Sequence, residues 1–240
     1  MILPYIGEKS KFSNFITPNI PENLSTYVEP FSGMFGVFFS LNYDDYQFNN
    51  YVYNDINDLN SNLFEHLKKS DFIKTVNIIS VDESKFKLAH NYILTGSDNM
   101  YLAINWLIIL TCSYPSDINR WRNDNEFEVF KLKYNSYKNQ LSKINKIHNL
   151  DYKEVIKMYD SKDTFFYIDP PYKGKESYYI NHNFNSNSHK ELSTILNNIK
   201  GKFLLSYYYF DGIKDLYKGC EFDSKRTIMG TEYLIMNYTL

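Results

Sequence analysis

The sequence predicts an α/β fold in which a mostly parallel sheet is covered by helices and ends in an antiparallel C-terminal strand. In the first third, short apolar runs alternate with turn residues and with residues at helical spacing, which is the pattern of βαβ units. A second observation is an apolar run that ends at Asp169, and a third is the pair of apolar runs that closes the chain. The 240 residues contain no internal repeat or Gly/Ser-rich linker, which predicts one domain or one domain with a small insertion.

Strands and helices are expected to alternate in the first third. The expected strands are Tyr27-Val28, which ends at Glu29-Pro30, then residues 51–53, and finally residues 76–81. A loop at 31–36 leads from the first strand into a helical turn at 37–39. Apolar residues recur at helical spacing over 56–68, which predicts an amphipathic helix between the second and third strands.

The segment 99–149 is expected to form a separate unit. Residues 102–110 predict a buried helix, whereas 114–147 are polar, basic and aromatic without clean periodicity. Residues 119–147 hold seven lysines and arginines against three acids, in a chain whose net charge is −2. This local charge suggests a surface that faces a polyanion, although a solvated helical face explains it as well. We expect a main domain at 1–98 and 150–240 with a small, mainly helical insertion at 99–149.

The last third returns to strands. Residues 164–168 are apolar and run into Asp169-Pro170-Pro171-Tyr172, and residues 202–210 form another strongly apolar run. A helix is expected between them at 189–199. Two runs at 226–229 and 233–238 predict the closing antiparallel hairpin.

Composition excludes several classes of protein. The 26 lysines and arginines balance 28 acids, so the chain is not a polycation that coats nucleic acid. Cys112 and Cys220 are too few for a disulfide scaffold or a cysteine zinc site. His182 and His189 are expected in a solvated loop and make no convincing metal pair. The longest apolar segment falls far short of the ~20 residues of a membrane span. These features predict a soluble, cytoplasmic protein, and the surplus of Lys, Asn, Tyr and Ile suggests the AT-rich codons of a virus or low-GC bacterium.

The sharpest chemical signal is the segment Asp169-Pro170-Pro171-Tyr172 at the end of an apolar strand. Open α/β sheets place their ligands at the carboxyl ends of strands. Neither proline has an N–H to extend the sheet, so the Pro170 carbonyl is expected to stay available. The Asp169 carboxylate and this carbonyl form an acceptor pair beside the Tyr172 ring, which suits a planar ligand with an amino group. An accidental Asp-Pro turn is the alternative.

A second signal is the loop 31–36, in which Gly33 lets the backbone turn tightly and approach a ligand. Asp55 ends the next strand about 20 residues later, the spacing at which Rossmann-type folds place an acid on ribose hydroxyls. The loop lacks a full G-x-G-x-x-G, which favours a mononucleoside-like ligand over a pyrophosphate. Asp55 as an ordinary helix N-cap is the alternative.

Four segments, in this order, resemble the Dam-like class of DNA adenine amino-methyltransferases. They are Pro4-Tyr5-Ile6-Gly7-Glu8-Lys9-Ser10, Tyr27-Val28-Glu29-Pro30-Phe31-Ser32-Gly33, Tyr53-Asn54-Asp55-Ile56-Asn57 and Asp169-Pro170-Pro171-Tyr172. The resemblance covers nearly the whole chain. It implies a Rossmann-like methyltransferase sheet that binds S-adenosylmethionine, with 99–149 as the target-recognition insertion. It also implies methyl transfer to the exocyclic N6 of an adenine flipped out of a specific short DNA sequence, with S-adenosylhomocysteine as product and no metal.

The resemblance assigns roles to particular residues. Catalysis falls to Asp169, Pro170 and Tyr172, because the acid and the carbonyl accept the amino hydrogens while the ring stacks on the base. The cofactor-binding positions are Tyr5, Lys9, Glu29, Phe31, Gly33, Asp55 and Asp169. Phe35 stands where the family has a small residue. Its ring is expected to point into the core while Gly36 supplies the turn, and the alternative is a ring that crowds the cofactor.

DNA contacts are expected from the insertion and from one loop. Asn119, Arg120 and Arg122 carry the amide and guanidinium groups that read base edges in the major groove. Lys131 and Lys133 suit phosphates, which position the protein without specifying sequence. Tyr178 and Tyr179 resemble the family's mobile loop after the catalytic segment. The expected partners are double-stranded DNA and a cognate restriction enzyme, and the expected assembly is a monomer or weak dimer.

Other functions stay open at this point. One is the same chemistry on cytosine or on RNA adenine, although family members that act on cytosine usually carry serine where Asp169 stands. Another is a catalytically weak or silent relative that binds the cofactor and DNA, suggested by Phe35 and the short insertion. Restriction-modification, viral self-protection and regulation are equally compatible roles.

Overall fold

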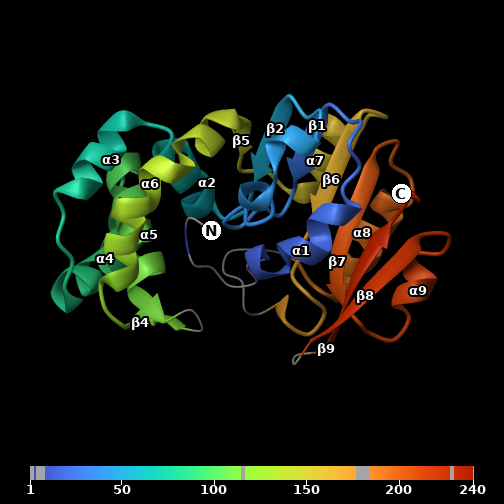
Figure 1. Ribbon diagram of the computed structural model, residues 1–240. Coiled ribbons are helices and arrows are strands. Elements are labelled where there is room, and N and C mark those ends of the chain that lie inside the picture. The colour runs from blue at the N-terminus through green and yellow to red at the C-terminus, as the bar shows by residue number, and fades with distance from the viewer. Residues whose placement is uncertain (1–2, 4–8, 115–116, 177–183, 228–229, 240) are drawn as a thin grey trace.

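The computed structural model describes residues 3, 9–114, 117–176, 184–227 and 230–239, and it confirms the predicted α/β fold. Within these residues, seven strands form one sheet in the order β5-β2-β1-β6-β7-β9-β8 (Figure 1). The first five strands in this order pair in parallel, and β9 runs antiparallel to both of its neighbours, as predicted for the C-terminus. The strands are β1 (Thr26–Glu29), β2 (Asn50–Asn54), β5 (Ile144–His148), β6 (Thr164–Ile168), β7 (Lys202–Tyr208), β8 (Glu221–Thr227) and β9 (Gly230–Met236).

Helices cover both faces of the sheet. Along β6, Phe165 and Tyr167 face one apolar core while Phe166 and Ile168 face another, as the two-residue period of a strand requires. Because both faces are covered, every residue of β6 is buried and the strand is a continuous apolar run. The helices on the Phe165 face are α1 (Ser13–Ile16) and α2 (Asp58–Leu67), and those on the Phe166 face are α7 (Tyr152–Tyr159), α8 (Ser186–Leu196) and α9 (Ile213–Leu216).

A helical bundle lies beyond the β5 edge of the sheet (Figure 1). Its centre is α5, in which every residue from Trp106 to Cys112 is buried, so this part of the helix has no solvent-facing side. The Trp106 indole donates to Asn60 Oδ1 of α2 at 2.9 Å, which joins the bundle to the helices that cover the sheet. The bundle consists of α3 (Ser70–Asn77), α4 (Glu83–Thr95), α5 (Asn99–Cys112), α6 (Asn125–Lys143) and the hairpin of β3 (Ser113–Tyr114) and β4 (Asp117–Trp121).

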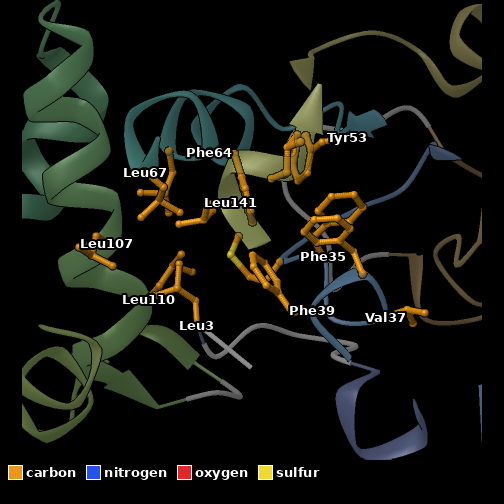
Figure 2. Packing of buried hydrophobic residues seen from close by; sticks show 14 of the residues in the cluster. Leu3, Phe35, Val37, Phe39, Tyr53, Phe64, Leu67, Leu107, Leu110 and Leu141 are labelled. Carbon is orange, nitrogen blue, oxygen red and sulfur yellow. The ribbon is translucent and has the colours of Figure 1, made fainter. Parts of the chain in front are cut away.

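One apolar core runs from the sheet into the bundle. Figure 2 shows a single cluster with members from the sheet side, from α2 and from α5. The bundle is therefore attached by packing and not only by its connecting segments. The labelled members of this cluster include Phe35, Phe39, Tyr53, Phe64, Leu67, Leu107, Leu110 and Leu141.

The strand expected at 76–81 is wrong. The helix α3 extends through Asn77, and the residues after it have no regular structure. Phe72 and Val76, four residues apart, are fully buried on one side of α3, whereas Ile78 is 85 % exposed. The β-branched residues favour a strand in isolation, and packing against the bundle overrides that preference.

The segment 114–147 is more regular than its sequence suggests. Most of it is the 19-residue helix α6, which buries only Phe127, Phe130, Tyr134 and Leu141, so polar residues obscure its period. The strand β5, inside the expected insertion 99–149, pairs with β2 in the main sheet. Conversely, α4, which precedes residue 99, packs on α5. No helix among the described residues has the length and apolarity needed to span a bilayer.

Candidate active site

Polar side chains gather where β1, β2 and β6 end, at one edge of the sheet. The loop 31–36 follows β1, Asp55 follows β2, and Asp169 follows β6. Parallel strands present their carboxyl ends at the same edge, which is where open α/β sheets bind ligands. The expected cofactor and catalytic segments therefore meet at this edge.

Asp169 forms an ion pair with Lys9. Lys9 Nζ lies 3.0 Å from Asp169 Oδ1, and the two side chains are only 9 % and 17 % exposed. Burial raises the pKa of Asp169, and the nearby Lys9 ammonium opposes that effect by stabilising the carboxylate. Burial alone would lower the pKa of Lys9, but Asp169 and Glu232 outweigh it and raise the pKa. Lys9 is therefore a cation that nearby acids stabilise. Its ion-pair partner Asp169 is about 160 residues away in sequence.

Tyr172 is enclosed by other side chains. Its ring stacks on Tyr207 with 5.4 Å between centroids, and Tyr208 meets it edge-on at 4.7 Å. Lys9 Nζ lies 4.8 Å from the same ring centroid, and Tyr172 is 8 % exposed. The sequence predicted an open aromatic face. In this conformation a base stacks on the ring only after one of these neighbours has moved.

Two functional candidates at this edge were missed from the sequence. Glu232 of β9 is 2 % exposed, and its Oε1 accepts a hydrogen bond from the Tyr172 hydroxyl at 2.5 Å. His189, expected in a solvated loop, is buried in α8, where Nδ1 contacts the Tyr207 hydroxyl and Nε2 lies 2.8 Å from Glu176 Oε1. An acid inside an apolar strand was the available signal for Glu232. No local pattern indicates the partners of His189.

The loop after β1 is fastened by Asp55. Asp55 Oδ2 accepts from the Gly33 backbone N–H at 2.8 Å, and Oδ1 accepts from Asn57 N–H at 2.8 Å. Burial raises the pKa of Asp55 to about 6, although both N–H donors act in the opposite direction. Gly33 has φ of 50°, a left-handed conformation that glycine adopts without strain. The side chain thus sets the shape of the loop and stays partly exposed beside it.

Phe35 points into the core, as expected. Its ring is fully buried and stacks on Phe38 at 4.2 Å between centroids. The turn differs from the expectation, because Phe35 itself has φ of 56° and Gly36 is not in the left-handed region. A left-handed non-glycine residue is uncommon and costs roughly 1–2 kcal/mol. Burial of the ring offsets that cost.

Glu29 faces the interior and not a ligand. Its Oε1 accepts from the Tyr27 hydroxyl at 2.6 Å and from Phe38 N–H at 3.2 Å. Burial raises the pKa of Glu29 well above its usual range. Glu29 thus braces the turn that follows the loop, and its cofactor contact stays a prediction. Phe31 of the same loop is half-buried and stacks on Tyr152 with 4.9 Å between centroids.

The residues expected to contact DNA divide into two groups. Asn119 and Arg120 of β4 are exposed, and the Arg120 guanidinium lies 4.1 Å from the centroid of the Tyr114 ring. Arg122, in contrast, donates to the Thr111 carbonyl at 3.3 Å near the end of α5. Lys131 donates to the Ile79 carbonyl at 2.9 Å and pairs with Glu128. Arg122 and Lys131 therefore hold the bundle together.

The other residues predicted for catalysis, cofactor or DNA differ in where they lie. Lys133 is exposed on α6. Pro170 is buried beside Asp169. Tyr5, Tyr178 and Tyr179 lie outside the described residues. Within the part of the chain that the structure describes, no group of three metal-ligating side chains occurs.

Comparisons with known proteins bear on this site. The family model for the D12 class N6 adenine-specific DNA methyltransferase matches residues 5–231. No curated protein sequence matches the chain. Among solved structures, the rRNA methyltransferase aviRa from Streptomyces viridochromogenes is similar, with a TM-score of 0.39 and 8 % sequence identity over 95 % of this chain and 83 % of that one.

Proposed function

Because this chain belongs to the D12 class N6 adenine-specific DNA methyltransferase family, we propose that its Lys9–Asp169–Tyr172 cluster is the centre at which the adenine amino group is methylated. The substrate is double-stranded DNA with a specific short target sequence, and the methyl donor is S-adenosylmethionine. The observation that carries this proposal is Asp169, an acid at the carboxyl end of a central parallel strand, followed by two prolines and paired with a buried lysine.

Asp169 and the Pro170 carbonyl act on the target nitrogen. The lone pair of an adenine amino group is delocalised into the ring, so the nitrogen is a poor nucleophile. Acceptance of its hydrogens by the carboxylate and the carbonyl favours a pyramidal nitrogen with a localised lone pair. That lone pair forms the N–C bond as the C–S bond breaks and its electron pair returns to sulfur. Asp169 stabilises the positive charge that develops on the nitrogen and takes the departing proton.

Lys9 keeps Asp169 ready for this role. The carboxyl accepts hydrogens well only when it is ionised, and burial at the sheet edge opposes ionisation. The ion pair with Lys9 restores the charged form before the base arrives. The target amino group then replaces the lysine as a donor to the carboxylate. Lys9 is thus proposed to poise the acid and not to react.

The loop after β1 fits S-adenosylmethionine, which supplies a methyl group on a sulfonium. The Asp55 carboxylate carries this fit: it is partly exposed and accepts one backbone N–H on each oxygen, from Gly33 and Asn57, and a side-chain hydrogen bond from Asn60. A carboxylate has about four lone-pair sites, so one remains to accept from a ribose hydroxyl. Gly33 lets the backbone come close to a ligand. We propose Asp55, Phe31 and Gly33 as cofactor contacts, with Tyr5 added from the family resemblance, and Glu29 as their support.

We propose that the bundle reads the DNA. Its exposed hairpin residues Asn119 and Arg120 carry the groups that bind adenine and guanine edges. The Tyr114 ring supports the Arg120 guanidinium, which reduces the freedom lost on binding. Lys133, on the exposed side of α6, is proposed for phosphate contact.

Methylation of unmodified genomic DNA tests the proposed function. The purified chain is incubated with DNA and S-adenosylmethionine, and N6-methyladenine is mapped by sequencing and quantified by mass spectrometry. We expect methylated adenine in one short sequence context and complete loss with Asp169→Ala, while duplex affinity is largely kept. Asp223→Ala, an exposed acid on β8, is the matched control. Activity in Asp169→Ala, or methylation of cytosine or RNA alone, refutes the assignment.

A further inference from the structure

Glu232 is a buried acid with no role so far in the proposed reaction. It is 2 % exposed and lies on β9, followed along the strand by the buried residues Leu234, Ile235 and Met236. Glutamate is rarely buried unless it is paired. Its position among core residues therefore indicates a specific polar partner.

The partner is the Tyr172 hydroxyl, which donates to Glu232 Oε1 at 2.5 Å. Hydrogen bonds in which the acceptor is ionised are short and roughly twice as strong as neutral ones. Tyr208 of β7 pairs directly with Glu232 in the sheet, and its ring packs edge-on against the Tyr172 ring. Two paired residues on neighbouring strands, Glu232 and Tyr208, thus both contact Tyr172.

The Tyr172 ring needs such an anchor. It stands in a loop after β6 that the prolines release from the sheet, and its backbone is held by a hydrogen bond from Lys175 N–H to the Tyr172 carbonyl at 2.8 Å. Tyr207 and Tyr208 restrict the rotation of the ring about its own axis. The hydrogen bond to Glu232 fixes the hydroxyl end, and with it the direction in which the side chain leaves the backbone.

The same acid completes the charge balance. Lys9 forms its ion pair with Asp169, and the charge of Glu232 also stabilises the ammonium. Burial raises the pKa of Glu232, while Lys9 and the Tyr172 hydroxyl oppose the rise. When the target amino group displaces Lys9 from Asp169, a second acid remains beside the lysine.

We propose that Glu232 is a positioning residue for methyl transfer, which acts by fixing the Tyr172 ring through its hydroxyl in the orientation that the target base requires. The inference rests on the proposed function of Asp169 and Tyr172. Glu232 is proposed to act on the rate through the phenol of Tyr172, to which it is hydrogen-bonded, and not by contact with substrate or donor.

A double-mutant cycle tests this coupling. The variants are Glu232→Gln, Tyr172→Phe and the double variant, and the readout is the single-turnover rate constant for methyl transfer at saturating DNA and S-adenosylmethionine. A hydrogen bond to a charged group is worth enough to lower the rate about tenfold when it is lost. We expect the rate constant to fall about tenfold in each single variant. In the double variant we expect it to fall by no more than that, because both substitutions remove the same hydrogen bond. Affinities for duplex and donor should stay within about twofold, because the binding surfaces are intact.

Several outcomes overturn the proposal. An about hundredfold loss in the double variant means that the two residues act independently. A wild-type rate in either single variant means that the hydrogen bond does not position the ring. Loss of duplex or donor affinity in step with the rate means that Glu232 only supports the fold. If Glu232→Gln fails to fold, Glu232→Asp takes its place in the cycle, since it keeps the charge and shortens the reach to the Tyr172 hydroxyl; a wild-type rate in Glu232→Asp or Tyr172→Phe again overturns the proposal.

Controls separate this proposal from the proposed function. Glu221→Gln makes the same chemical change at an exposed position of β8 and should keep the wild-type rate. Asp169→Ala should be inactive in the same assay. An active Asp169→Ala or an inactive wild type refutes the proposed function, whereas an inactive Asp169→Ala beside unaffected Glu232→Gln and Tyr172→Phe refutes only the role of Glu232.

Discussion

Removal of the Lys9 ammonium should change both the stability and the pH dependence of the protein. Lys9 Nζ and Asp169 Oδ1 are 3.0 Å apart, and two unit charges at that distance attract by about 5 kcal/mol at an effective dielectric constant of ~20. Desolvation of both groups offsets part of this attraction, and loss of one partner of a buried pair typically costs about 3–5 kcal/mol. Both side chains are less than one-fifth exposed, so solvent screens the pair little. We expect Lys9→Met to lose about 3 kcal/mol of unfolding free energy at neutral pH.

The sign of the pH effect follows from the pair. Burial raises the pKa of Asp169 even beside Lys9, and without Lys9 the pKa rises further because no opposite charge favours the carboxylate. The folded pKa then lies above the unfolded one, so the variant loses stability as pH rises through the folded pKa. At lower pH the neutral form of Asp169 is favoured, and that form needs no cation. The stability gap between variant and wild type should therefore shrink there.

Two measurements check this prediction. Denaturant unfolding at pH 5 and pH 8 gives the stability gap, and single-turnover methyl transfer against pH gives the acid limb at saturating donor. The acid limb should move to higher pH in Lys9→Met and stay in place in Lys11→Met, an exposed lysine two residues on. An unmoved acid limb, or an equal stability loss at both pH values, refutes the role assigned to the ion pair.

Two further predictions concern the ligand contacts. Burial raises the pKa of Asp55 to about 6, so the affinity of the wild type for S-adenosylmethionine, measured by calorimetry, should weaken about fourfold from pH 8 to pH 5.5. In Asp55→Asn the affinity should be weak at both pH values. A wild-type affinity that does not change with pH contradicts the contact. Arg120→Ala should weaken cognate duplex binding by about 1–3 kcal/mol without a change in stability, whereas Arg122→Ala should lower the free energy of unfolding by about 1–2 kcal/mol. Fluorescence anisotropy with cognate and scrambled duplexes and thermal melts separate the two, and equal effects on both readouts contradict the division.

The layered sheet was predictable because its signals are local. The strand β6 is apolar throughout and ends at Asp169, so its position and its buried state follow from the residues themselves. The same holds for the helix α2, whose apolar spacing matches its buried side, and for the closing hairpin. The strand expected at 76–81 failed because helix and strand compete closely in a short β-branched run, and the neighbouring helices decided between them.

Partners across the chain were beyond such reasoning. Arg122 and Arg120 are two residues apart and chemically identical, yet one caps the end of α5 and the other faces solvent. Glu29 ends β1 and Asp55 follows β2, and their carboxylates accept the backbone N–H groups of Phe38 and Gly33, respectively. Which side of an element is covered depends on what packs there, and that information is not local.

Apolar periodicity and turn residues act over a few neighbouring positions, so they were enough to predict most strands of the sheet and the acid that follows its central strand. The surroundings of that acid depend on how the chain folds in space. Lys9 comes from the N-terminal segment and Glu232 from the last strand, and both reach the Asp169–Tyr172 segment through the fold. Electrostatic and hydrogen-bond partners are determined by distance in space. Residues this far apart in sequence share no local pattern that predicts how close they lie in the fold.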